Sequence, residues 1–128
     1  MNPVELKYNK EHEYAKSEGS IVTFGITDHA QESLGDVVFV ELPDVGAEVT
    51  AGESYGTVES VKAVSDITAS VSGKVIEVNT AVMDAPDLLN SDPYGEGWLI
   101  KVEAEDLSPL DEMMTAEEYE VFVAQEDH

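Results

Sequence analysis

The chain has 128 residues, 42% of them hydrophobic, which suits one domain with a real core and is too apolar for a disordered chain. Its 28 acidic residues outweigh six basic ones, and the formal charge of −22 makes nucleic acids and anionic membranes poor partners because like charges repel. The absence of cysteine excludes a disulfide, a thiolate nucleophile and a cysteine-based metal site.

The N-terminal stretch MNPVELKYNKEHEYAK has neither an apolar signal-peptide segment nor an arginine, so it resembles no targeting sequence. No apolar run in the chain approaches the roughly 20 residues that a membrane-spanning helix needs. We therefore expect a cytoplasmic protein.

Short β-strand patterns dominate the region from 20 to 104. Segments that are rich in Val, Ile and Phe and bounded by Gly, Asp or Pro predict strands at 20–27, 36–42, near 49, 54–60, 63–69, 73–79 and 98–103. Between the first two, Thr27 as N-cap and Gly35 as C-terminal stop predict a short helix. Residues 83–97 are typical of a long loop with one helical turn. Such closely spaced strands predict a mainly β fold, a small barrel or a sandwich.

The pattern changes after residue 104. Thr115 and Glu118 have the spacing of a capping box, which predicts a helix from there onward. The side chains of Tyr119, Phe122 and Val123 would share one face of that helix and pack on the β core. Residues 1–128 are therefore predicted to form a single domain, with a β core over about 20–104 and a helical segment over about 105–126.

A single lysine lies in the connection between two predicted strands. Val61 and Lys62 leave room only for a tight hairpin turn, so the Lys62 side chain should project from its tip. Taken alone, this pattern is also typical of a surface lysine that keeps a sheet edge soluble.

The residues around this lysine resemble a known family. ESVKA followed by SD is similar to the lysine-bearing hairpin of lipoyl domains. A longer series of motifs resembles the H-protein family of the glycine cleavage system, through HEY (12–14), GITDHAQESLGDVVFVELPDVG (25–46), AGESYGTVESVKAVSD (51–66), VSGKVIEVN (71–79) and LLNSDPYGEGWLIKV (88–102). The resemblance covers nearly the whole chain. It implies a lipoyl/biotinyl-type hybrid barrel sandwich with short helices and a C-terminal helix.

The resemblance also implies a function. Lipoate would be amide-linked to Lys62 by a lipoate ligase or lipoyl transferase, and the chain would act as a carrier that other enzymes use as a substrate. The carrier would take an aminomethyl group from a pyridoxal-phosphate glycine decarboxylase to a folate-dependent aminomethyltransferase. Dihydrolipoyl dehydrogenase would then reoxidise the dithiol. We expect a monomer, because brief visits to several enzymes suit one.

Two sets of site residues follow from the same resemblance. Enzymes that act on the lysine would recognise its small neighbours on the hairpin, which are Glu59, Ser60, Val61 and Ala63. The loaded arm would fold into a cleft on the protein, where Glu13 and Asp66 are the candidate acceptors for the cationic amine.

Two alternatives stay open. The chain could be a lipoyl carrier or relay for another multienzyme system, or an unmodified acidic module whose hairpin docks on a partner. Intact mass separates the module from both carriers, and decarboxylation assays with glycine and with 2-oxo acids separate the carriers from each other. The three histidines, His12, His29 and His128, lack the spacing of a zinc motif, so we expect no metal site.

Overall fold

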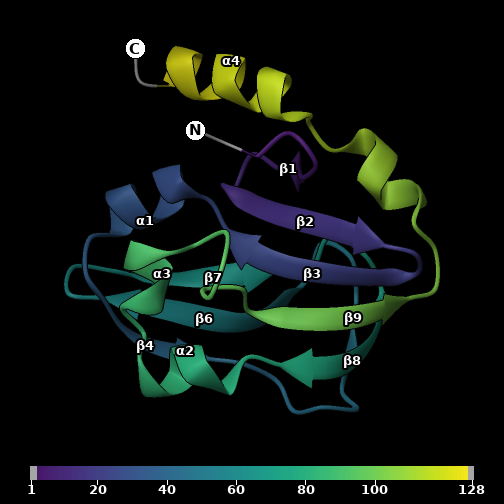
Figure 1. The fold of residues 1–128 in the computed structure, drawn as a ribbon, viewed down its shortest axis with the longest axis horizontal. Helices are drawn as coiled ribbons and strands as arrows, with labels where there is room; N and C mark the ends of the chain where they lie inside the picture. Colours follow the sequence, from purple (N-terminus) through teal and green to yellow (C-terminus); the bar gives the residue numbers. More distant parts are fainter. Residues whose placement is uncertain (1–2, 127–128) are drawn as a thin grey trace.

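Two antiparallel sheets form the body of the molecule (Figure 1). The computed structural model describes residues 3–126. The larger sheet has six strands in the order β1 (Lys7–Tyr8), β2 (Glu13–Glu18), β3 (Ile21–Ile26), β9 (Ile100–Ala104), β8 (Gly73–Val78) and β5 (Glu48–Val49). The smaller sheet has three strands in the order β4 (Val37–Glu41), β6 (Ser54–Ser60) and β7 (Val64–Thr68). The predicted mainly β sandwich is confirmed.

The core lies between the sheets. Strand β9 alternates in the way expected of a half-buried strand, whereas β3 is buried from Val22 to Ile26. Val22, Phe24, Ile100 and Val102 all belong to the buried core. A second buried cluster packs the smaller sheet against the helices that follow β8, with Val58 and Leu89 among its members. Every strand predicted between 20 and 104 is present, with ends that differ by one or two residues.

The short helix after β3 forms as predicted. Helix α1 (Asp28–Leu34) begins after Thr27, whose Oγ1 accepts a hydrogen bond from the N–H of Ala30 at 3.1 Å. It ends at Gly35, where φ is +77° and the N–H donates to the carbonyl of Gln31 at 3.0 Å. Ala30 and Leu34 pack against the second core cluster, so α1 is fixed beside the smaller sheet.

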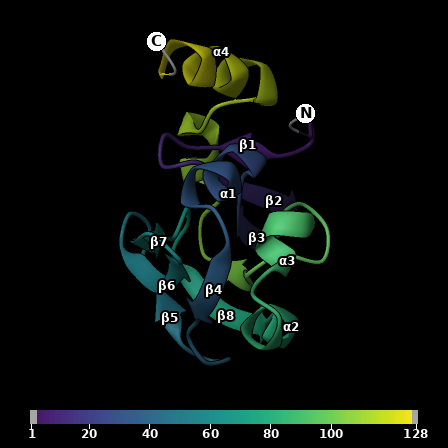
Figure 2. The same ribbon diagram turned by 90° about the vertical axis from the view of Figure 1, so that its left-hand side faces the viewer.

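Two short helices occupy the region after β8. Helix α3 (Leu88–Ser91) is the helical turn predicted within 83–97, whereas α2 (Thr80–Asp84) was not predicted. Asn79 starts α2 by accepting from the N–H of Ala81 at 3.2 Å, and its Nδ2 donates to the carbonyl of Trp98 at 2.6 Å. Figure 2 shows α2 and α3 on the opposite side of the view from β6 and β7.

The C-terminal segment consists of a 3₁₀ helix (Ser108–Glu112) and α4 (Ala116–Glu126). The predicted capping box is present, with Thr115 N–H donating to Glu118 Oε1 at 2.9 Å and Glu118 N–H donating to Thr115 Oγ1 at 3.2 Å. Figure 1 shows α4 lying over β1. Tyr119 is fully buried there, stacked on Tyr8 with ring centroids 4.8 Å apart, so the predicted apolar face is confirmed.

The N-terminal strands were not predicted. Strands β1 and β2 extend the larger sheet to residues before 20, where the sequence indicated that the β core begins. Strand β2 buries only its first half, Glu13 to Ala15, and exposes the rest, so it lacks the regular alternation that marks a half-buried strand. Within residues 3–126, no helix is both long enough and apolar enough to cross a bilayer.

Candidate functional site

A tight hairpin between β6 and β7 carries the lysine that the sequence singled out. Glu59 pairs with Val64, and the N–H of Ser60 donates to the carbonyl of Ala63 at 2.8 Å, which closes the hairpin. Lys62 is exposed at this turn, and within residues 3–126 it makes no ion pair. Its primary amine is therefore accessible, as the hairpin prediction required.

The hydroxyl of Ser60 organises the turn from inside. The N–H groups of Lys62 and Ala63 both point at Ser60 Oγ, at 3.3 and 3.1 Å. Ser60 is buried, so its side chain contributes to the shape of the turn rather than to its surface. The sequence suggested this residue for recognition; that role stays a prediction, and the turn-forming role is the one that sequence reasoning missed.

The turn is also joined to the end of α1. The N–H of Val61 donates to the carbonyl of Asp36 at 3.1 Å. A Cβ placed on Gly35 would lie 3.6 Å from Lys62 Cε, so the alkyl stem of the lysine lies against this glycine. The base of the lysine is thus held between the hairpin and α1.

The other hairpin residues named by the sequence face solvent. Glu59, Val61 and Ala63 are exposed around Lys62. Four large apolar side chains are exposed near them on β4 and the hairpin, which are Val38, Phe39, Val61 and Val64. We call these four the apolar rim. Exposed valine and phenylalanine beside an acidic surface are typical of a contact surface for another protein.

Glu13 has a different environment from an ordinary surface carboxylate. It is buried, and it accepts hydrogen bonds from the N–H and Oγ1 of Thr68 at 2.9 and 2.7 Å, and from Asn9 Nδ2 at 2.9 Å. Burial raises the pKa of the Glu13 carboxyl, against the opposing effect of these donors. Because Glu13 begins β2 and Thr68 ends β7, the carboxylate links the two sheets.

The structure brings both candidate cleft residues to one cavity. This cavity has a volume of about 150 Å³ and lies between α1 and the hairpin. Its apolar lining comes from Ile26, Ala30, Leu34, Val58 and Ile67, and its polar lining from Glu11, His12, Glu13, Ser33, Ser65 and Asp66. Leu34 is next to Gly35, so the cavity begins close to the stem of Lys62. A mixed cavity of this kind can hold an alkyl chain that ends in a polar or cationic group.

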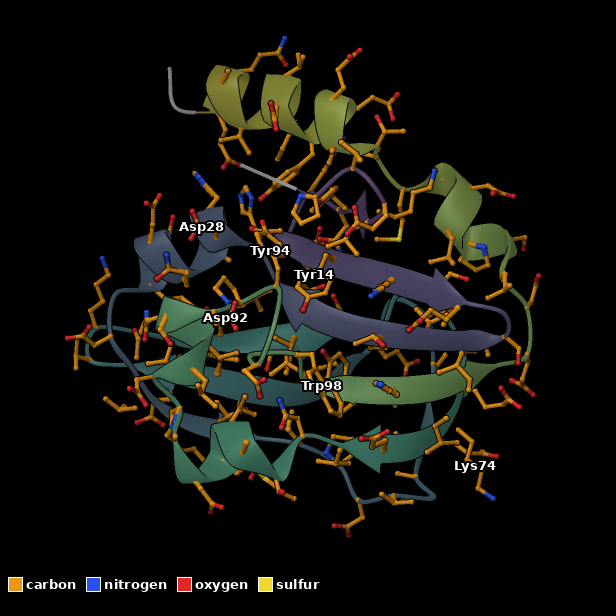
Figure 3. All side chains as sticks on the ribbon, viewed as in Figure 1. Tyr14, Asp28, Lys74, Asp92, Tyr94 and Trp98 are labelled. Carbon is orange, nitrogen blue, oxygen red and sulfur yellow. The ribbon has the colours of Figure 1, made fainter. Side chains whose placement is uncertain are left out.

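A tyrosine after α3 keeps α1 in position over this cavity. Tyr94 Oη accepts a hydrogen bond from the N–H of Asp28 at 3.0 Å, and its ring lies 5.4 Å from that of Tyr14. Figure 3 shows Tyr94 between Asp28 and Tyr14. Tyr14 donates to the carbonyl of Pro93 at 2.8 Å and covers Gly25 of β3, which leaves no room for a Cβ there. These contacts fix the first turn of α1 to β2 and the loop.

Comparisons with known proteins agree with this geometry. The family model described as "Glycine cleavage H-protein" matches residues 6–126. The chain is 56% identical over 124 residues to the glycine cleavage system H protein of Carboxydothermus hydrogenoformans, covering 97% of this chain and 95% of that protein. It is 55% identical over 121 residues to that of Geobacillus kaustophilus, covering 94% of this chain and 95% of that protein.

A solved structure shares the fold. The crystal structure of a glycine cleavage system H protein from Mycobacterium marinum superimposes with a TM-score of 0.88 at 44% identity, and the match covers 96% of this chain and 99% of that chain. The chain therefore belongs to the glycine cleavage H-protein family and serves the glycine cleavage system as a carrier protein, not as an enzyme.

Proposed function

We propose that Lys62 is joined to lipoate by an amide bond, and that the chain carries the aminomethyl group of glycine between the enzymes of the glycine cleavage system. When attached, lipoate supplies the redox-active disulfide that this cysteine-free chain lacks. The proposal rests above all on one observation, the exposed Lys62 amine at a rigid turn between two strands.

The turn meets the needs of an attachment site. Lys62 Nζ, in its neutral form, would attack the activated carboxyl carbon of the lipoyl donor, lose a proton and release the activating group. The amide is uncharged, so the formal charge of the chain becomes one unit more negative. Ser60 and the carbonyl of Asp36 fix the backbone on both sides of the tip. A fixed base leaves the tether as the main moving part, which suits a carrier.

The surface around Lys62 suits visiting enzymes. The apolar rim would form the centre of an interface from which water is excluded. The acidic surface around it would favour partners whose contact surface is basic at its edge. We infer four partners, which are a pyridoxal-phosphate glycine decarboxylase, a folate-dependent aminomethyltransferase, dihydrolipoyl dehydrogenase, and a lipoate ligase or lipoyl transferase. The enzyme that attaches lipoate would recognise the exposed residues Glu59, Val61 and Ala63. We also propose that the chain acts as a monomer and in the cytoplasm.

The cavity between α1 and the hairpin would receive the loaded arm. Glu13 and Asp66 place two carboxylates in its lining, and a carboxylate is the natural acceptor for a cationic amine. Glu13 Oε2 accepts one hydrogen bond, from Thr68, so a lone pair remains for a ligand. The apolar side chains of the lining would exclude water from the arm. The position of the Lys62 stem beside Gly35, next to Leu34, supports this direction of folding.

The attachment is tested by intact mass. The chain is coexpressed with a lipoate ligase, and the wild type is compared with Lys62→Arg and with Lys74→Arg, which alters another exposed lysine (Figure 3). We expect one lipoyl group on the wild type and on Lys74→Arg, and none on Lys62→Arg. A lipoyl group on Lys62→Arg would place the attachment elsewhere and overturn the proposal.

The carrier role is tested by reconstitution. The lipoylated chain should support carbon dioxide release from glycine by glycine decarboxylase, and should fail with 2-oxo acid dehydrogenase components. Activity with a 2-oxo acid system alone would assign the chain to another multienzyme complex. A chain that stays unmodified and supports neither reaction would be an acidic interaction module instead.

A further inference from the structure

Three distant segments of the chain bring two imidazoles and a carboxylate together beside the cavity. His12 lies in the loop before β2, His29 in the first turn of α1, and Glu126 in the last turn of α4 (Figure 1). Glu126 Oε1 is 2.8 Å from His12 Nε2 and 3.6 Å from His29 Nε2. We propose that His12, His29 and Glu126 form a binding site for a divalent transition-metal ion of the zinc type.

The donor set decides the class of ion. Imidazole nitrogens with one carboxylate oxygen suit Zn²⁺ and its transition-metal neighbours, whereas Mg²⁺ and Ca²⁺ prefer oxygen ligands alone. The three candidate ligand atoms lie within 4.8 Å of one another. Tetrahedral ligands at about 2.1 Å from a zinc ion are about 3.4 Å apart, so small rotations of these side chains would bring the three ligand atoms to that spacing.

The site is partly open to solvent. The side chains of His12 and His29 are 17% and 22% exposed, and that of Glu126 is 41% exposed. Three protein ligands with access to solvent leave the fourth position to water. The ion would therefore exchange with the medium and would not be permanently enclosed.

A second hydrogen-bond layer orients His12. Its Nδ1 is 2.7 Å from Tyr119 Oη, which is in turn 2.7 Å from Thr27 Oγ1. When Nε2 binds a metal, Nδ1 keeps its proton and donates it to Tyr119 Oη, and the tyrosine donates to Thr27. When no metal is present, the reverse direction lets Nε2–H donate to Glu126. Support of this kind for the second ring nitrogen is a regular feature of metal-binding histidines.

The backbone at His12 adds a separate observation. Its φ is +65°, in the left-handed region that few residues other than glycine adopt. The conformation is held by hydrogen bonds from His12 N–H to the carbonyl of Asn9 at 3.2 Å and from Thr27 N–H to the carbonyl of His12 at 3.0 Å. The imidazole of His12 lies beside that of His29, with ring centroids 4.4 Å apart.

A bound ion would connect α4 to α1 and to the loop before β2. These three elements otherwise meet through Tyr119 and the contacts around it. The ion would therefore raise the thermal stability of the folded chain by mass action. The sequence predicted no metal site, because no local spacing indicates that His12, His29 and Glu126 meet.

The test is a zinc titration of the tag-free chain against a chromophoric chelator. Excess Mg²⁺ occupies the many surface carboxylates, so that only imidazole-containing sites report. The variants are Glu126→Gln and His29→Asn, and Glu120→Gln alters another exposed glutamate of α4 as the control. Circular dichroism verifies that each variant is folded.

We expect one zinc ion per chain and a zinc-dependent rise in melting temperature for the wild type and Glu120→Gln. The affinity of Glu126→Gln and His29→Asn should fall by about tenfold or more. Imidazole nitrogen NMR shifts should report coordination at Nε2 of both His12 and His29. Equal affinity in all four proteins, or no zinc binding by the wild type in excess Mg²⁺, would overturn the assignment.

Discussion

Glu13 accepts two hydrogen bonds from Thr68, one from its N–H at 2.9 Å and one from its hydroxyl at 2.7 Å. The pair joins β2 of the larger sheet to β7 of the smaller one. A candidate cleft residue is therefore also a structural link between the sheets. Any variant of Glu13 has to be examined for stability before its effect on the carrier is interpreted.

Replacing Glu13 by Gln should destabilise the fold. The carboxylate accepts three hydrogen bonds, and an amide that keeps one acceptor oxygen turns an N–H₂ group toward at least one of the donors. Leaving a buried donor unpaired costs about 1–3 kcal/mol of unfolding free energy. Urea denaturation at pH 7 measures this loss. Asp66→Asn is the control, and its unfolding free energy should stay within about 0.5 kcal/mol of the wild-type value because Asp66 is exposed. Equal stability of Glu13→Gln and the wild type would show that the carboxylate does not link the sheets.

The cost of Glu13→Gln should depend on pH. Burial raises the pKa of Glu13 above its usual value near 4.5, so the folded state holds this proton more tightly than the unfolded state. The stability that protonated Glu13 contributes is fully present below that usual pKa and is lost as pH rises through the raised pKa of the folded state. The deficit of the variant should thus narrow as pH rises from about 4.5 toward neutrality. Urea midpoints in high salt across this range test the sign, and a deficit that widens would contradict it.

Ser60→Ala should loosen the lysine turn. The variant removes the acceptor for the N–H groups of Lys62 and Ala63, and the expected loss is about 1 kcal/mol of unfolding free energy. The rate of lipoylation by a ligase should fall as well, because the amine is held less firmly. Ser65→Ala on the same hairpin is the matched control. If both variants were lipoylated at the wild-type rate, the Ser60 hydroxyl would be unimportant for presenting Lys62.

Phe39→Ser should weaken partner contact without harming the fold. Phe39 is 53% exposed in the apolar rim, so its replacement should change stability by less than about 0.5 kcal/mol. If the rim is a contact surface, the catalytic efficiency of a ligase or of glycine decarboxylase toward the chain should fall roughly fivefold, a loss of about 1 kcal/mol. Val45→Ser, at an exposed valine outside the rim, should behave like the wild type. Equal turnover of Phe39→Ser and Val45→Ser would argue against the apolar rim as a contact surface for the enzymes.

Gly25→Ala should conflict with Tyr14. A Cβ at position 25 would meet the Tyr14 ring within van der Waals distance, and the ring is held by Pro93. Overpacking of this kind costs about 1–3 kcal/mol. The double variant with Tyr14→Leu should recover part of the loss, and a double-mutant cycle in urea measures that coupling. Strict additivity of the two substitutions would show that they do not share the space.

Local patterns in the sequence were enough for much of the fold. The strands from β3 to β9 have β-branched residues between turn residues, α1 has Thr27 and Gly35 at its ends, and α4 has its capping box. Strand β2 was missed because it buries only its first half. The exposed position of Lys62 could be predicted because a short gap between two strands forces a turn, although the structure leaves three residues, Val61 to Ala63, between β6 and β7 where the sequence indicated two.

The remaining features depend on contacts between distant residues. Glu13 and Thr68 are 55 positions apart, and nothing near either residue indicates the other. His12 and Tyr119 are 107 positions apart. Ser60 is buried where it pairs with Val37 of β4, a strand that the hairpin sequence does not contain. Packing between the sheets, α1 and α4 decides these contacts.

The backbone of Gly35 disfavours a side chain, and Lys62 lies directly beside it. Its positive φ of +77° would strain any L-residue, and the space where a Cβ would point is bordered by Lys62 Cε at 3.6 Å. The end of α1 therefore leaves room for the alkyl stem of Lys62 beside Gly35. A residue with a side chain at position 35 would strain the backbone that leads into β4 and would contact Lys62, so the helix end and the lysine stem both depend on the same position.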